Sequence, residues 1–174
     1  MDRLDSAALP IAHTVLRILI VLNWLFGAGI LVLLVAMIVA RDWTFAALGV
    51  PPGATLPPVV FGLRSIAALG WVAIPLNHVV LSRLLAMVNT VRGRDPFAAA
   101  NADRLLAVAW ALLALQVLGM AIGTIGKAVS AYVHPLHLDA GFSVSGWLAV
   151  LLAFILARVF AEATHMRDDL EGTV

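Results

Sequence analysis

Four long apolar stretches, separated by shorter polar segments, dominate the pattern of hydrophobic and polar positions along the chain. They cover roughly residues 18–40, 59–81, 105–126 and 143–157. A bilayer hydrocarbon core about 30 Å thick requires about 20 apolar residues of α-helix to cross it. Residues 30–39 contain no polar side chain, whereas helices of a soluble bundle show a polar face with a 3.6-residue period. The pattern therefore predicts an all-α integral membrane protein with four transmembrane helices.

With their flanking turns, the predicted spans are 16–40, 59–82, 104–126 and 143–162. No polar connection between them is long enough to form a separate soluble domain, so residues 1–174 are predicted to be a single membrane domain. The composition agrees, because 63% of the residues are hydrophobic and 12% are charged, against about 45–50% and about 25% in soluble domains.

The charge and cysteine counts exclude several classes of function. The formal net charge is only +1, so no long-range field attracts nucleic acid, and no direct nucleic-acid binding is expected. The chain has no cysteine, which excludes disulfides, thiolate metal sites and cysteine nucleophiles. No serine–histidine–acid set is apparent at membrane depth, so we expect a protein that is not an enzyme.

The basic residues predict the orientation in the membrane, because they concentrate on the cytoplasmic side of membrane proteins. One predicted side holds Arg3, Arg17, Arg83, Arg92, Arg94, Arg104, Arg158 and Arg167. The other side holds only Arg41 and Lys127. Both termini and the middle connection are therefore expected to be cytoplasmic. The outer connection 42–58 contains two proline pairs and is expected to be extended and irregular.

The middle connection is expected to form a protruding cytoplasmic hairpin between the second and third helices. Apolar residues keep a helical spacing beyond residue 83, Gly93 suits the position after a helix, and Asp95 and Pro96 suit the start of the next. Each helix would project about ten residues, or about 15 Å, beyond the membrane. The tip, with Arg92, Arg94 and Asp95, would either contact water and anionic lipid head groups or bind a cytoplasmic partner.

Several segments resemble a known family. Residues 85–97, 101–106 and 110–116, together with the tail 167–174, are similar to bacterial four-helix membrane proteins of domain of unknown function family 2975. The resemblance implies a multi-pass protein of the bacterial cytoplasmic (inner) membrane. Members are often encoded beside a small helix-turn-helix regulator, which implies a DNA-binding protein as a cytoplasmic partner. The family implies no catalytic residue.

Polar residues inside the predicted spans are candidates for ligand contacts or for helix packing. They are Arg64, Asn23, Asn77, His78 and Gln116. Arg64 could snorkel to the head groups, pair with Asp42, or contact an anionic ligand. The other four could form interhelical hydrogen bonds or line a small ligand pocket. The pattern leaves these alternatives open.

Three glycines in the third span, Gly119, Gly123 and Gly126, would let helix backbones approach closely. They would serve packing within the bundle or the seam of a homodimer.

The outer pair His134 and His137, with Asp139, is a weak candidate for a metal site. Two imidazoles fall short of the three or four ligands that zinc requires, so we expect no metal and no cofactor. An enzyme or redox subunit that uses His78 or this pair is a third and weaker hypothesis.

The leading hypothesis is a membrane-embedded regulatory or tethering protein, surrounded by membrane lipids, that signals to the cytoplasmic regulator. Its contact surfaces would be the basic hairpin tip and the acidic tail with Asp168, Asp169 and Glu171. The alternative is a small transport or immunity component that binds a peptide or lipid within the bundle. Because four helices are few for a transporter, this alternative would require a dimer.

Overall fold

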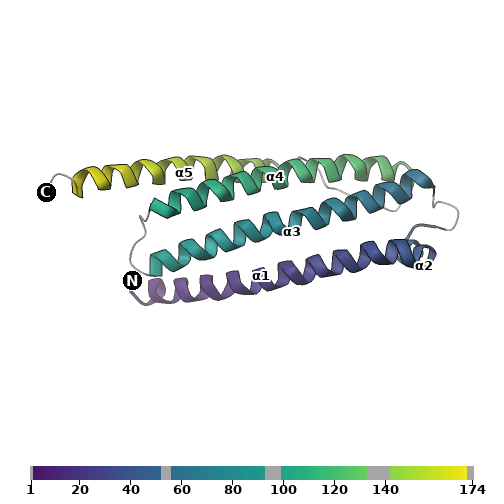
Figure 1. The fold of residues 1–174 in the computed structure, drawn as a ribbon, viewed down its shortest axis with the longest axis horizontal. Coiled ribbons are helices and arrows are strands. Elements are labelled where there is room, and N and C mark those ends of the chain that lie inside the picture. The colour runs from purple at the N-terminus through teal and green to yellow at the C-terminus, as the bar shows by residue number, and fades with distance from the viewer. Residues whose placement is uncertain (1, 52–55, 93–98, 133–141, 172–174) are drawn as a thin grey trace. The chain divides into compact units, whose positions relative to one another are not determined.

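Five α-helices form the protein in a computed structural model, which describes residues 2–51, 56–92, 99–132 and 142–171 (Figure 1). In chain order they are α1 (Asp2–Val39), α2 (Arg41–Ala47), α3 (Pro57–Arg92), α4 (Ala99–Ser130) and α5 (Val144–Glu171). Four of them contain a stretch that is long and apolar enough to cross a membrane: Leu9–Val39, Pro57–Val91, Ala100–Ser130 and Val144–Thr164. The predicted all-α fold with four transmembrane helices is confirmed. The side that each helix end faces stays a prediction.

The transmembrane helices are longer than the predicted spans. α1 begins at Asp2 rather than near residue 16, and Pro10 lies inside it. The Thr14 hydroxyl donates a hydrogen bond of 3.0 Å to the Pro10 carbonyl. α3 continues to Arg92, which confirms that the second helix runs beyond the apolar stretch. The predicted turn at Gly93, Asp95 and Pro96 lies outside the described residues.

The prediction of an irregular outer connection is wrong at α2, the helix Arg41–Ala47, which includes residues 42–47 of that connection. Gly49 adopts φ +80° directly after this helix, and the next amide, that of Val50, donates to the Phe45 carbonyl at 3.0 Å. The Gly49 amide donates to the Ala46 carbonyl at the same distance. This pattern is a Schellman motif, in which a glycine and an apolar residue after it end a helix. The side chains of Phe45 and Val50 are both buried, as this motif favours.

The second proline pair of this connection also differs from the expectation, whereas Pro51 is not helical and Pro52 lies outside the described residues. Pro57 and Pro58 form the first turn of α3 instead of extended chain. A proline at the start of a helix loses nothing by its missing N–H, because the amides of the first turn have no partner within the helix.

The chain divides into two compact units, and each long helix except α5 contributes to both. Unit 1 comprises Met1–Asn23, Leu76–Ala114 and Val144–Val174, and unit 2 comprises Trp24–Pro75 and Leu115–Ser143. The single membrane domain over residues 1–174 stays a prediction.

Unit 2 contains an apolar core made by the end of α1, α2, the start of α3 and the end of α4. Its buried members are Met37, Phe45, Val50, Val59, Val60, Leu63 and Val129. Gly62 leaves room for the Val129 side chain of α4, because a Cβ atom built on Gly62 would clash with it. The short helix α2 therefore completes the core by inserting Phe45, which is fully buried.

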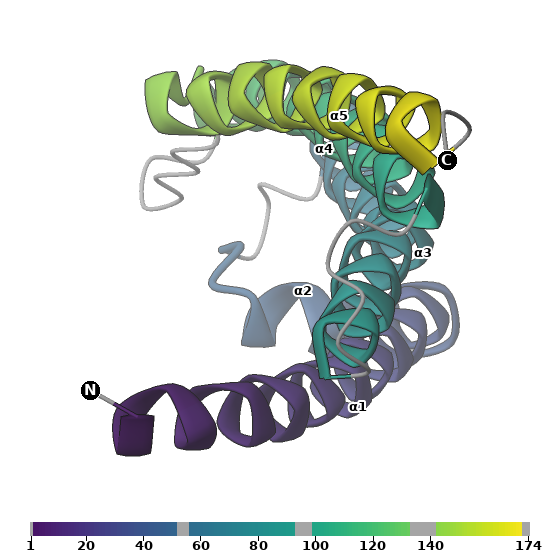
Figure 2. The same cartoon turned by 90° about the vertical axis from the view of Figure 1, so that its left-hand side faces the viewer.

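Within unit 1, residues 99–114 of α4 pack against α5, and these two segments lie side by side in Figures 1 and 2. The rings of Trp110 and Phe154 meet edge to face, with centroids 5.4 Å apart and an interplanar angle of 88°. Alanines are buried on both helices, among them Ala109 and Ala157. Small side chains allow two helices to approach closely where lipid supplies no hydrophobic driving force between them.

Candidate functional site

A network of polar side chains joins α3 to α4 within unit 1. The Arg104 guanidinium donates from Nη1 to Asn101 Oδ1 at 2.8 Å and to the Ala86 carbonyl at 3.4 Å. Asn101 Nδ2 donates to the Thr90 hydroxyl at 3.0 Å. That hydroxyl donates in turn to the Met87 carbonyl at 2.7 Å. Asn101 is 1% exposed, so the centre of the network is sealed from the surroundings.

The direction of the donors follows from the chemistry of the three side chains. A guanidinium has only donors, so it requires the carbonyl oxygen of Asn101 to face it and the amide nitrogen to face Thr90. The Thr90 hydroxyl also lies 3.1 Å from Asn101 Oδ1, a second acceptor for its proton. Hydrogen bonds in such a network polarise one another. A guanidinium donor also makes a stronger bond than a neutral one. The network therefore specifies one arrangement of the two helices rather than a range of similar ones.

The same contacts give the register of the hairpin. Thr90 pairs with Asn101, and Ala86, one turn earlier on α3, is reached by Arg104, about one turn later on α4. Partners that move in opposite directions along the two helices indicate antiparallel packing. The predicted hairpin of the second and third helices is therefore confirmed for the described residues.

The predicted contact surfaces on either side of this network are only partly described. Arg92 is the last residue of α3, but its side chain lies outside the described residues, as do Arg94 and Asp95. Asp168, Asp169 and Glu171 lie in the last turns of α5, with side chains that are also not described. The partner-binding role of these six residues stays a prediction.

Arg64 stabilises the end of another helix. Its Nη2 donates to the carbonyl of Met37 at 2.5 Å, in the last turn of α1. The last four carbonyls of a helix lack an amide partner within the helix, and a cation near them is favourable. The Thr44 hydroxyl donates at 3.0 Å to the Ala36 carbonyl, which also accepts from the Ala40 amide at 2.8 Å. Asp42, the expected partner of Arg64, is instead exposed.

One hydrogen-bond donor of the Arg64 side chain is unsatisfied among the residues that the structure describes. Its Nε is buried and has no acceptor within the described residues. An unsatisfied buried donor costs about 1–3 kcal/mol, so the helix-end contact is partly offset. Whether Arg64 also contacts an anionic ligand stays a prediction.

The remaining polar residues of the spans do not share one environment. Asn23 and His78 are half-buried, and both make polar or electrostatic interactions. Asn77 and Gln116 are also half-buried. Their assignment to packing or to a ligand pocket stays a prediction.

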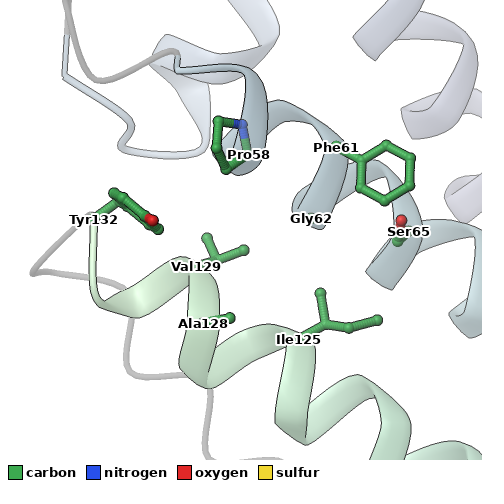
Figure 3. Close-up of a pocket in the computed structure, with 8 residues that line it drawn as sticks. All are labelled: Pro58, Phe61, Gly62, Ser65, Ile125, Ala128, Val129 and Tyr132. Atoms are coloured by element: carbon green, nitrogen blue, oxygen red, sulfur yellow. The ribbon is translucent and has the colours of Figure 1, made fainter.

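The glycines of α4 differ from one another. Gly123 and Gly126 are buried, whereas a Cβ atom built on Gly119 would meet nothing within 4 Å. Tight glycine contacts also occur at Gly62 of α3 and at Gly27 of α1, where an added Cβ atom would lie 3.0 Å from Ile74. Gly62 lies beside a cavity of about 240 Å³ (Figure 3). That cavity is lined by Pro58, Phe61, Gly62 and Ser65 of α3, by Ile125, Ala128 and Val129 of α4, and by Tyr132.

The weak metal-site candidates His134, His137 and Asp139 lie outside the described residues. Within the part of the chain that the structure does describe, no group of three metal-ligating side chains occurs. The metal prediction is therefore untested at its own residues.

A comparison with known protein families shows to which family the chain belongs. The model of the family described as "Protein of unknown function (DUF2975)" matches residues 39–174. The chain belongs to this family. No curated protein and no solved structure matches it. The resemblance drawn from the sequence is confirmed, and the matched region of this DUF2975 protein includes the whole polar network and almost none of α1.

Sequence reasoning missed the Thr90–Asn101–Arg104 network of this DUF2975 protein. Asn101 and Arg104 were noticed only within the family resemblance and the charge pattern, and Thr90 was not singled out. A signal was present, because Asn101 and Arg104 are three residues apart and so share one helix face. Their partner on α3 could not be identified, because only the packed hairpin brings Thr90 opposite Asn101.

Proposed function

We propose that this protein is a membrane-embedded tether that regulates a cytoplasmic helix-turn-helix transcription regulator through the α3–α4 hairpin. The observation that carries the proposal is the buried Thr90–Asn101–Arg104 network. A loop that served only to connect two spans would not need a sealed polar network beside it. A network of this kind holds the helices in one register and so presents the residues at their ends in a constant arrangement.

The charges of the adjoining segment support this use. Arg92 and Arg94 lie between Thr90 and Asn101 along the chain, and Asp168, Asp169 and Glu171 lie in the last turns of α5. Complementary charges steer association and suppress wrong partners. The helix-turn-helix nature of the partner comes from the family resemblance, in which members are often encoded beside such a regulator.

The alternative of a transport or immunity component gains no specific support. In unit 2, a cavity of about 310 Å³ is lined by Trp24, Gly27, Ala28, Leu31, Trp71, Ile74 and Pro75. Neither Arg64 nor Gln116 lines it, although both belong to that unit. We therefore advance no second function.

The test is co-purification of the full-length protein, from detergent-solubilised membranes, with the helix-turn-helix regulator encoded beside its gene. The double variant Arg92→Glu/Arg94→Glu should weaken the complex at least about tenfold, because it places like charges opposite each other. The matched control is Arg17→Glu, which reverses an exposed arginine on α1. Absence of binding by the natural protein, or equal binding by the hairpin and control variants, would refute the proposal.

A further inference from the structure

A groove between α4 and α5 in unit 1 carries charges of both signs. Its volume is about 310 Å³, and Asp103 and Arg158 both line it. Both side chains are exposed, and no ion pair joins them in the part of the chain that the structure describes. By contrast, the cavities of about 240 and 310 Å³ in unit 2 have no charged lining residue.

The two charged side chains lie at one end of the groove, and its apolar side chains extend to the other end. Its other lining residues are Ala102, Leu106, Phe154, Ala157 and Ala161. Because α4 and α5 are antiparallel here, Asp103 and Arg158 share one end, and Leu106 and Phe154 lie about one helical turn, or about 5–6 Å, further along. The edge-to-face contact with Trp110 holds Phe154 at the apolar end.

The groove is open because several of the side chains that line it are small. Ala157 is 6% exposed and packs at its base, and Ala102 and Ala161 are half-buried beside the charges. Its volume is at the lower end of the range of about 300–1,000 Å³ for small-molecule sites. This space accommodates a head group and the beginning of a chain rather than a whole lipid.

The charged end lies at the edge of the apolar spans. Asp103 directly precedes the predicted third span, and Arg158 lies in the last turn or so of the predicted fourth. Lipid head groups meet a membrane protein at this depth. A ligand with a cationic group, an anionic group and a hydrocarbon chain matches this groove. Its two charges would meet Asp103 and Arg158 at the level of the head groups, and its chain would lie along the apolar residues.

We propose that the groove between Asp103 and Arg158 is a binding site for a phospholipid with a primary amine, of the phosphatidylethanolamine class. The carboxylate of Asp103 accepts hydrogen bonds from the ammonium group, and the guanidinium of Arg158 donates to the phosphate. The first methylenes of an acyl chain lie against Leu106 and Phe154. A carboxylate on one side of the site selects against a purely anionic head group, because it would repel a second negative charge.

The experiment is native mass spectrometry of the purified full-length protein in detergent, titrated with an equimolar mixture of phosphatidylethanolamine and phosphatidylglycerol with identical chains. The natural protein should retain phosphatidylethanolamine in preference. Asp103→Asn should reduce this preference about three- to fivefold, the range expected for an exposed charge pair. Arg158→Gln should lower the binding of both lipids by a similar factor.

Two matched controls separate the site from general effects of charge. Glu162→Gln neutralises an exposed acid one turn after Arg158, and Arg17→Gln neutralises an exposed arginine of α1. Neither residue lines the groove, so both variants should bind like the natural protein. All four side chains are exposed or at a groove rim, so thermal unfolding should be unchanged.

Three results would overturn the proposal. One is equal retention of the two lipids by the natural protein. Another is an Asp103→Asn variant that behaves like Glu162→Gln. The third is displacement of the lipid by an equimolar amount of soluble phosphoethanolamine, because the ligand would then be a soluble zwitterion and not a lipid. None of these results bears on the binding of the transcription regulator, so the two proposals fail independently.

Discussion

Phe45 in unit 2 and Asn101 in unit 1 are large side chains that are almost completely buried among the described residues, with exposed fractions of 0% and 1%. Phe45 lies in an apolar core formed by parts of α1, α2, α3 and α4. Asn101 lies in a network whose other members are Thr90 and Arg104. Burial of an apolar ring stabilises in proportion to the area covered and tolerates small shifts. A buried side-chain amide does not tolerate such shifts, because each of its donors and acceptors must keep a hydrogen-bond partner.

The difference indicates what each unit is built to do. An apolar core in unit 2 stabilises the packing of α2 onto the long helices. The polar network in unit 1 adds a defined register to the hairpin from which the proposed partner surface extends. The following variants test this contrast, from the largest expected effect to the smallest.

Phe45→Ala should be the most destabilising single substitution in unit 2. Removal of a fully buried phenyl ring costs about 3–5 kcal/mol, since a cavity remains. Unfolding of the detergent-solubilised protein by sodium dodecyl sulfate measures the change. Phe61→Ala is the control, because Phe61 is 75% exposed and should change the free energy of unfolding by less than about 0.5 kcal/mol. Similar losses for both would show that α2 does not complete the core.

Asn101→Leu should destabilise the protein by about 1–3 kcal/mol, because Arg104 and Thr90 each lose their side-chain partner and keep only a backbone carbonyl of α3. The same unfolding titration measures it, with the exposed Asn89→Leu as control. Adding Thr90→Val to Asn101→Leu should cost clearly less than Thr90→Val alone, since the two side chains interact. Additive effects would mean that the network does not act as a unit.

Gly62→Ala and Gly119→Ala should have effects of opposite sign. A Cβ atom at residue 62 would clash with Val129, and overpacking costs about 1–3 kcal/mol. At residue 119 the space is open, so the alanine should stabilise the helix by about 0.5–1 kcal/mol. The two melting temperatures, measured in the same detergent, decide the matter. A loss of stability at residue 119 would instead place that glycine in a helix interface.

Local sequence signals predict the helical hairpin and also contain a signal for α2. The helical hairpin and the end of α3 near Gly93 follow from apolar spacing and helix-ending residues. The same kind of reasoning could have found α2, because Gly49 and the apolar residues 45 and 50 form the pattern of a Schellman motif. The two proline pairs instead favour an extended connection, although Pro57 and Pro58 suit the start of a helix equally well.

The candidate sites were less predictable, for a physical reason. Arg64 was noticed because a charge at membrane depth is unusual, but its partner is a backbone carbonyl of Met37. Every helix has such carbonyls at its end, so no residue type marks the one that is used. The groove between Asp103 and Arg158 depends likewise on the distance between two helices, which depends on the small side chains that face each other.

The sequence by itself determined the membrane-spanning character, the number of long helices and their order, and the membership of the DUF2975 family. These properties depend on hydrophobic length and on motifs that are continuous along the chain. Tertiary structure alone decided that Thr90, Asn101 and Arg104 form one network, that Phe45 returns to the core, and that Asp103 and Arg158 line one groove. Those contacts join residues on different helices, and their partners become neighbours only when the helices pack.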